Sequence, residues 1–427
     1  MEGHSSSNNF TRIARDLLFF AVLFALGVAF FALVRNNTFW HPDDYQYLIQ
    51  ALRIDQSLSE IFAAAPHDNF QPVINFIFFL EYKFFGLTAW YYYLFNIFIH
   101  SLNAFLVYSL LRTLLADRTI ALLSAFMFVF AVGNYGKAVM VVSGVSDLII
   151  TMLTLLTMNF YIRNEINDRG RVRTGNFLLT MLFFALGLMS KATSFSVLGC
   201  MLAFNMFYRQ QSGRRIFDRN FLTIAGFSLL VLVAKLSLLG SIPGSNDLQI
   251  FSWSVPKTLA SYLVRMVFPI HYSTLVADSG PVVKFTYQLA SQIRLLIFMC
   301  IVSYSVFGFV FGNRVIRFFI AWTYIVVTPF CFFRFPSDWL NIRYLYLVSV
   351  GFVMILASGT TLAARLLYQK QWRRLLPFLV PVFFVLLSRF VVSKLDTNYE
   401  ALANSPRLDT VKEQFHDEYR RVNKGGL

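Results

Sequence analysis

Residues 16–45 read DLLFFAVLFALGVAFFALVRNNTFWHPDDY, an apolar run followed by a short polar stretch that ends at two adjacent aspartates and a tyrosine. The apolar part, 16–34, has about the length that an α-helix needs to cross a bilayer. The whole chain repeats this character: of its 427 residues, 57% are hydrophobic and only 14% are charged, and the mean hydropathy is +0.59. A soluble domain could not cover so much apolar surface. We therefore predict an all-α polytopic membrane protein.

Apolar runs along the chain predict about eleven membrane spans. They cover residues 16–34, 89–111, 118–133, 145–161, 176–190, 192–208, 220–239, 294–312, 315–332, 344–362 and 375–392. The fifth and sixth runs are together too short for two full crossings, so they are expected to meet at Ser190-Lys191 below the membrane surface. The expected organisation is one transmembrane domain over 1–392, with outer loops at 35–88 and 241–293, and an extracytoplasmic tail at 393–427.

The net charge of +15 would suggest nucleic-acid binding in a soluble protein. Here the positive-inside rule explains it, because lysine and arginine concentrate in short loops such as 162–175 and 209–219. These loops are expected in the cytoplasm, and no nucleic-acid partner is predicted. The long first outer loop then faces the other side, where Asp43 to Phe62 and Val73 to Phe85 could form interfacial helices.

Asp43 and Asp44 are the sharpest candidates for chemistry, because two carboxylates lie at the outer membrane edge. One could accept a proton from an acceptor hydroxyl while the other binds the acceptor or positions its neighbour. The alternative is structural: either residue could be the N-cap of an interfacial helix. The chain shows no Walker A, GxSxG, HExxH or CxxC motif, so the sequence does not support an ATPase, an α/β hydrolase or a zinc protease.

Several cations map to the outer ends of the spans. They are Lys137, Lys191, Lys235, Arg334, Arg343 and Arg389. A charge at such a depth usually faces a cavity or a partner, and an anionic lipid phosphate would suit the group. The alternative for each of them is snorkelling to the interface.

Asp147 could contact sugar hydroxyls or a catalytic cation, or it could be a favourable acid in a first helical turn. The histidines His41, His67 and His271 have no metal-ligand spacing, so no metal site is predicted, although the carboxylates could bind a divalent ion.

Six short motifs, in order along the chain, resemble those of GT-C glycosyltransferases, especially the branch of transmembrane-and-TPR O-mannosyltransferases and their bacterial relatives. The motifs are Asp43-Asp44, Gln71-Pro72-Val73 with Asn96 to Asn103, Ser143-Gly144 with Asp147-Leu148, Met189-Ser190-Lys191, Tyr262-Leu263 with Phe268-Pro269, and Arg343 to Leu347 with Ser349 to Phe352. The chain departs from the family at Gln71 and Val145, where arginine is usual, and it shows no TPR repeat. The resemblance implies a GT-C fold with a long first outer loop.

The resemblance also implies a mechanism. The donor would be a polyprenyl-phosphate-linked sugar, and Asp43 or Asp44 would deprotonate the acceptor hydroxyl for an inverting displacement at the anomeric carbon. Arg343 and Lys191 would hold the lipid phosphate, with Arg334 and Lys137 as second choices. The predicted sugar and acceptor pocket contains Asp147, Tyr344, Tyr346 and His41, although Tyr344 and Tyr346 could instead be interfacial aromatics.

The sequence therefore predicts a membrane glycosyltransferase whose partners are a lipid-linked sugar donor, an acceptor and the bilayer. The acceptor would be a protein hydroxyl, as in a pilin or another surface protein, or alternatively lipid A or a cell-envelope glycan. The expected location is a bacterial inner membrane with a periplasmic active site, or alternatively the ER membrane with a lumenal one. A transporter or lipid flippase is the rival, but it predicts inverted repeats and paired broken helices, and only the break at Ser190-Lys191 is found.

Overall fold

The computed structural model describes residues 3–64, 69–166, 174–209, 213, 215–239, 252–268, 281–332, 342–367, 375–397 and 406–424. All regular elements in these ranges are helices, as predicted. The first part of the chain forms α1 (Gly3–Phe30), η1 (Ala32–Asn36), α2 (Pro42–Gln56), η2 (Leu58–Phe62), α3 (Pro72–Phe85), α4 (Ala89–Leu114), α5 (Arg118–Val129), α6 (Lys137–Met140), η3 (Val142–Gly144), α7 (Val145–Ile166) and α8 (Thr174–Leu188). The second part forms η4 (Ala192–Phe195), α9 (Ser196–Phe204), η5 (Asn205–Arg209), α10 (Arg219–Leu239), α11 (Ser254–Val267), α13 (Pro281–Phe311), α14 (Arg314–Cys331), η8 (Ile342–Tyr344), α15 (Leu345–Leu366), α16 (Leu376–Thr397) and α18 (Pro406–Lys424).

The chain is a multi-pass membrane protein. Eight segments of the described chain are long and apolar enough to cross a bilayer: Ile13–Phe30, Ala89–Leu114, Val142–Ile166, Arg219–Ser237, Gln292–Phe311, Arg314–Cys331, Ile342–Leu366 and Pro377–Leu395. The other three predicted spans fall on α5, α8 and α9, which have 12, 15 and 9 residues. The predicted break at Ser190-Lys191 is confirmed, because α8 ends at Leu188 and η4 begins at Ala192.

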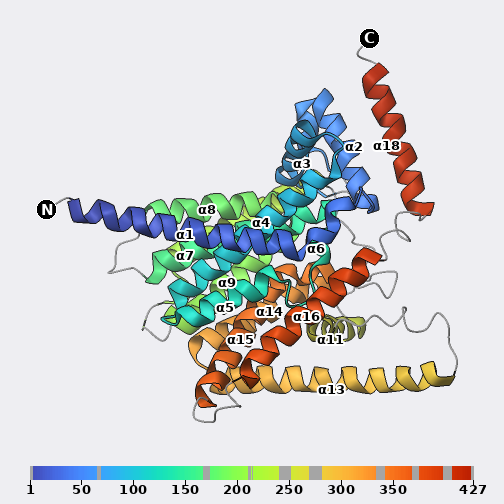
Figure 1. Cartoon of the computed structure of the whole chain (residues 1–427). Helices are drawn as coiled ribbons and strands as arrows, with labels where there is room; N and C mark the ends of the chain where they lie inside the picture. The colour runs from blue at the N-terminus through green and yellow to red at the C-terminus, as the bar shows by residue number, and fades with distance from the viewer. Residues whose placement is uncertain are drawn as a thin grey trace.

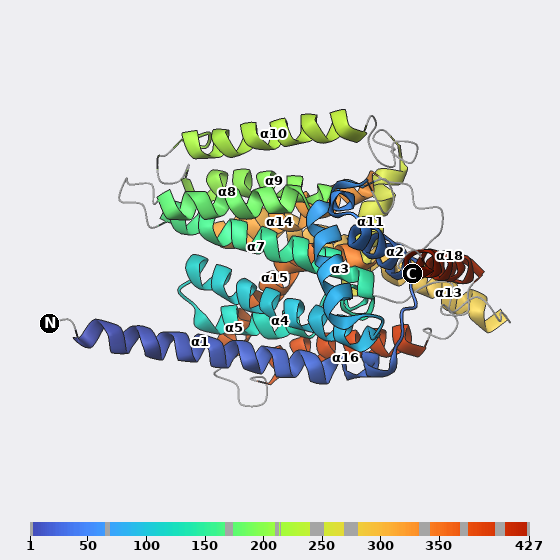
Figure 2. The same cartoon turned by 90° about the horizontal axis from the view of Figure 1, so that it is seen from above.

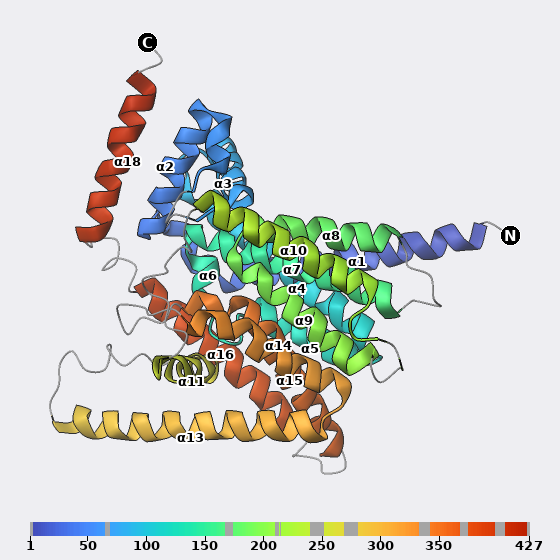
Figure 3. The ribbon, with the colours of Figure 1, turned by 180° about the vertical axis from the view of Figure 1, so that it is seen from behind.

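The spanning helices form a bundle with two distinct ends (Figure 1). The N-terminus of α1 lies at one end, and α2, α3 and α18 project at the other. Helix α7 packs between α4 and α8, and α15 packs on α5 and α14. Two long helices lie at the edges of the bundle: α10 beyond α8 and α9 (Figure 2), and α13 beyond α11 (Figure 3).

Polar side chains tie the central helices together. The Nδ1 atom of His100 on α4 lies 2.7 Å from the Tyr346 hydroxyl on α15. The amide of Asn103 donates to the carbonyl of Leu148 on α7 at 2.9 Å. Because lipid gives helices no hydrophobic reason to associate, such interhelical hydrogen bonds and close packing fix the neighbours and their register.

The first outer loop folds into the helices that its amphipathic pattern predicts, α2 with η2 and α3. Tyr47 of α2 stacks on Phe78 of α3, with ring centroids 4.4 Å apart. Helix α18 packs on the other side of α2, where Phe415 lies against Tyr45. These contacts hold the N-terminus of α2, and with it the acidic pair, above the end of the bundle.

Candidate active site

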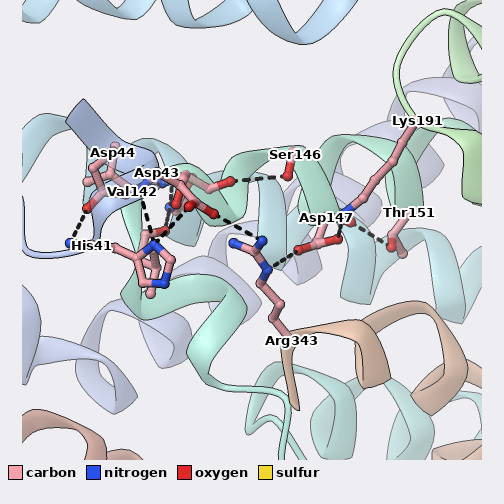
Figure 4. Close-up of polar contacts among 12 residues, drawn as sticks. His41, Asp43, Asp44, Val142, Ser146, Asp147, Thr151, Lys191 and Arg343 are labelled. Carbon is pink, nitrogen blue, oxygen red and sulfur yellow. Dashed lines mark hydrogen bonds and ion pairs between the residues drawn. The ribbon is translucent and has the colours of Figure 1, made fainter. Parts of the chain in front are cut away.

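The acidic pair lies in the first turn of α2 (Figure 4). His41 is the N-cap: its Nδ1 accepts a hydrogen bond from the backbone N–H of Asp43 at 3.3 Å. Asp44 completes a capping box by accepting from the N–H groups of His41 at 3.1 Å and Trp40 at 3.3 Å. The alternative in which Asp43 or Asp44 is the N-cap is wrong, because α2 already starts at Pro42, a residue that suits the first helical position.

Asp44 also joins α2 to the chain before α7. Its Oδ1 accepts a hydrogen bond from the backbone N–H of Ser143 at 2.8 Å, and its side chain is fully buried. Burial raises the pKa of Asp44 to about 6, against the opposing effect of the N–H groups of Ser143 and His41. The next residue, Gly144, lies against the backbone of α6: a Cβ there would be 2.0 Å from the carbonyl oxygen of Ala138. Only glycine allows the backbone of Ser143 to reach Asp44.

Asp43 points to a cluster of charges from three other segments of the chain (Figure 4). The Nη2 of Arg343, on η8, donates to Asp43 Oδ2 at 3.2 Å. The Nε of Arg343 lies 3.5 Å from Oδ2 of Asp147, in the first turn of α7. Lys191, at the break before η4, forms an ion pair with the other oxygen of Asp147. One guanidinium therefore bridges two carboxylates, each held at a helix N-terminus, where the helix dipole favours negative charge.

The Nε of Arg343 and the Oδ2 of Asp147 are incompletely satisfied. Both atoms are buried, and neither has a hydrogen-bond partner among the described residues. The 3.5 Å between them fits an ion pair but is long for a hydrogen bond. A buried guanidinium with an unused N–H can accept an anion with little rearrangement.

Two further predicted residues border this cluster. Lys137 begins α6, and burial with the nearby charge of Arg343 lowers its pKa to about 8, while Asp43 and Asp44 oppose the shift. The ring of Tyr344 lies 5.2 Å from Lys191 Nζ and 5.6 Å from Arg343 Cζ, within reach of cation–π attraction.

Tyr346 does not join the cluster. Tyr346 is 1% exposed, and its hydroxyl contacts His100 and Asn103 in the core between α4 and α15. Arg334 lies outside the described residues, as do His67 and His271.

Tyr47 lies near the cluster, although no motif in the sequence points to it. It is buried one helical turn after Asp43, and its hydroxyl accepts a 2.9 Å hydrogen bond from the side-chain amide of Gln71. Burial and the charge of Asp43 raise its pKa. The signal available in the sequence was the helical spacing of four residues, which places Tyr47 and Asp43 on one face of α2.

Among the described residues, no three or more histidine, cysteine, aspartate or glutamate side chains gather as a metal site would require. Asp43 and Asp147 approach each other only through Arg343. In this arrangement each carboxylate pairs with a cation.

The fold is that of the GT-C glycosyltransferases, the class that the sequence motifs predict. The apo structure of the oligosaccharyltransferase from Archaeoglobus fulgidus has a TM-score of 0.55 at 13% identity, over 94% of this chain and 59% of that one. AglB from the same organism, in complex with an inhibitory peptide and a dolichol-phosphate, has a TM-score of 0.53 at 13% identity, over 95% of this chain and 60% of that one. A complex of the A. fulgidus enzyme with Zn and sulfate has a TM-score of 0.54 at 14% identity, over 93% of this chain and 56% of that one.

The chain thus spans about three fifths of the length of these proteins. Residues 66–237, less than half of the chain, match the family described as dolichyl-phosphate-mannose-protein mannosyltransferase. No curated protein matches the chain. The matched segment includes α7 and the break before η4, and therefore contains Asp147 and Lys191 of the charge cluster.

Proposed function

We propose that the chain is a glycosyltransferase that moves a sugar from a polyprenyl-phosphate donor to a hydroxyl acceptor on the non-cytoplasmic side of the membrane. The observation that carries the proposal is the charge cluster: Arg343 and Lys191 meet Asp43 and Asp147 at one end of the membrane bundle. Sugar transfer from a lipid phosphate to a hydroxyl needs a base for the hydroxyl proton and positive charge at the leaving phosphate. A carboxylate beside two cations can supply both. The dolichol-phosphate bound by AglB, which has the same fold, supports the choice of donor.

Arg343 and Lys191 would hold the donor phosphate. In the free protein their charges are neutralised by Asp43 and Asp147, so a phosphate has to compete with these carboxylates. The Nε of Arg343, which has no good hydrogen bond, gives the phosphate a first donor. As the bond between the anomeric carbon and the phosphate oxygen breaks, the electron pair stays on the phosphate, and the preorganised cations stabilise the charge that develops there.

Asp43 would act as the base. The acceptor hydroxyl loses its proton to the Asp43 carboxylate while its oxygen forms the new bond to the anomeric carbon with inversion. Asp44 would act as a positioning residue, because three backbone N–H groups already occupy its oxygens. When a phosphate binds Arg343, Asp43 loses its ion-pair partner. The basicity of the Asp43 carboxylate then rises.

We propose a protein hydroxyl as the acceptor, with a lipid or envelope glycan as the second candidate. The inhibitory peptide in the AglB complex favours a protein acceptor. The acceptor side would be the end with α2, α3 and α18, since α10 begins with Arg219 toward the other end, and the side rich in arginine is expected in the cytoplasm. In a bacterium this side is the periplasm.

The test is mass spectrometry of surface glycoproteins and glycans from the wild type, a deletion strain, and the deletion complemented with wild type, Asp43→Asn or the control Asp409→Asn. Asp409 is exposed on α18 and lies outside the cluster. We expect one sugar to disappear from one acceptor in the deletion and to return with the wild type and the control only. A glycome that is unchanged by the deletion would contradict the proposal, as would full restoration by Asp43→Asn.

A further inference from the structure

The end of the bundle opposite the charge cluster carries a second set of charged residues. Arg209, at the end of η5, is 12% exposed at its side chain and forms ion pairs with Glu165 of α7 and, at 3.0 Å, with Asp218. Its Nε donates to the carbonyl of Arg215 at 3.1 Å. This network joins η5 and α7 to Arg215 and Asp218, which precede α10 at Arg219. Both acidic side chains pair with Arg209, which offsets part of their negative charge.

An open hollow of about 730 Å³ lies at this network. Its lining includes Arg209, Arg215, Phe217, Asp218, Arg219 and Leu222. The guanidinium groups of Arg215 and Arg219 are exposed and have no partner within the described part of the chain. Phe217 and Leu222 are also exposed, at 57% and 55%. The hollow thus combines two unpaired cations with two exposed apolar side chains.

The hollow lies at a membrane boundary. Arg219 is the first residue of the candidate span Arg219–Ser237, and Leu222 lies one turn inside it. The far end of α10 reaches the active-site side, where Lys235 Nζ donates to the carbonyl of Phe70 at 3.2 Å. Figure 2 shows α10 along the edge of the bundle, with its first residues toward the end that holds the N-terminus. With 21 residues, α10 separates the hollow from that side by about 30 Å.

We propose that this hollow binds the headgroup of an anionic phospholipid from the leaflet opposite the active site. The phosphate would accept forked hydrogen bonds from Arg215 and Arg219, a geometry that guanidinium groups favour. Leu222 would contact an acyl chain, and Phe217 would lie at the level of the headgroups. Basic pockets at the ends of spanning helices characteristically bind anionic lipids, and the exposed apolar residues favour a lipid over a free anion.

The test is lipid binding to the full-length protein in detergent, counted by native mass spectrometry with phosphatidylglycerol or phosphatidylcholine. The variant is R215Q/R219Q, and R112Q/R118Q is the matched control, because Arg112 in the last turn of α4 and Arg118 at the start of α5 are exposed arginines outside the hollow. We expect phosphatidylglycerol to bind the wild type and the control equally, and the variant about 30-fold more weakly, since each basic residue at an anionic surface contributes about a factor of five. R215K/R219K should keep most of the binding.

Three results would overturn the proposal. One is that R215Q/R219Q binds phosphatidylglycerol as well as the wild type does. Another is that the control R112Q/R118Q loses as much binding as R215Q/R219Q. The third concerns inorganic phosphate: if it raises the Tm of the wild type as much as phosphatidylglycerol does, the hollow is a simple anion site. The Tm of each variant without lipid checks that it is folded. Sugar transfer is not part of the readout, so the outcome is independent of the proposed activity.

Discussion

Asp43 and Asp44 are neighbours in the sequence, but their carboxyl groups meet different surroundings. Asp44 is fully buried and accepts hydrogen bonds from three backbone N–H groups. Asp43 keeps 9% of its surface exposed and faces Arg343. Successive residues on a helix point about 100° apart, so one acid fixes the backbone while the other is presented to the charge cluster.

Asp44 should make the stability of the protein depend on pH. Burial raises its pKa from 3.8 to about 6, so the folded state binds this proton more tightly than the unfolded chain does. The contribution of protonated Asp44 to the free energy of unfolding is therefore complete below about pH 4. It falls, by on the order of 3 kcal/mol, as the pH rises to about 6. In Asp44→Asn, which does not titrate, we expect the Tm to fall less steeply over this interval. Parallel Tm curves for the two proteins would show that Asp44 titrates normally.

Lys137 should make the activity depend on pH. Its pKa is lowered to about 8 by burial and by Arg343, so the free protein loses this cation as the pH rises through about 8. If the charge helps to bind the donor phosphate, kcat/KM for the donor falls above that pH. Lys137→Arg keeps its charge and should retain kcat/KM up to about pH 9. A wild-type profile that is flat to pH 9, or one that Lys137→Arg does not change, would remove Lys137 from donor binding.

At the scale of elements, the site depends on short pieces that join long helices. Helices α2 and α7 each direct one acid of their first turn to the charge cluster, η8 supplies Arg343, and the break before η4 supplies Lys191. The close approach of η3 to α6 joins α2 to α7 through Asp44 and Ser143.

The close approach at Gly144 gives a direct test. A Cβ in Gly144→Ala would meet the Ala138 carbonyl oxygen at 2.0 Å, so α6 and η3 have to separate and Asp44 loses its bond from Ser143. We expect a loss of about 3 kcal/mol in stability, seen as a lower Tm, and a loss of transfer activity. Gly226→Ala on α10 is the control, since nothing lies within 4 Å of its added Cβ. Equal Tm values for the two variants would contradict the packing described here.

Long apolar runs predicted the spanning helices, because length and hydropathy decide whether a helix can cross a bilayer. The remaining three predicted spans fall on α5, α8 and α9, which have 12, 15 and 9 residues and are shorter than a helix that crosses a bilayer by itself. The motifs pointed to Asp43, Asp147, Lys191 and Arg343, and the structure brings these together. Their pairing was not predictable, since it depends on contacts across as many as 300 residues. Tyr346 was predicted to line the pocket or to be an interfacial aromatic, but its hydroxyl contacts His100 of α4 in the core.

At the scale of the whole molecule, the charged groups divide between the two ends of the bundle. One end holds the cluster of Asp43, Asp147, Lys191 and Arg343, and the other holds the arginine-rich hollow at the start of α10. The bundle separates them by about the thickness of a bilayer. This division gives the proposed transferase a reactive side and an anchoring side.

The most direct test of the central claim is a transfer assay with the purified protein in vesicles. A polyprenyl-phosphate sugar and a hydroxyl acceptor are supplied, and mass spectrometry counts the glycosylated acceptor and the released polyprenyl phosphate. For the wild type and Asp409→Asn we expect the two products in equal amounts. For Asp43→Asn we expect at least about a 100-fold lower rate, the usual contribution of a general base, with donor binding within about threefold of the wild type. Full transfer by Asp43→Asn, or no transfer by the wild type from any polyprenyl-phosphate sugar, would contradict the account.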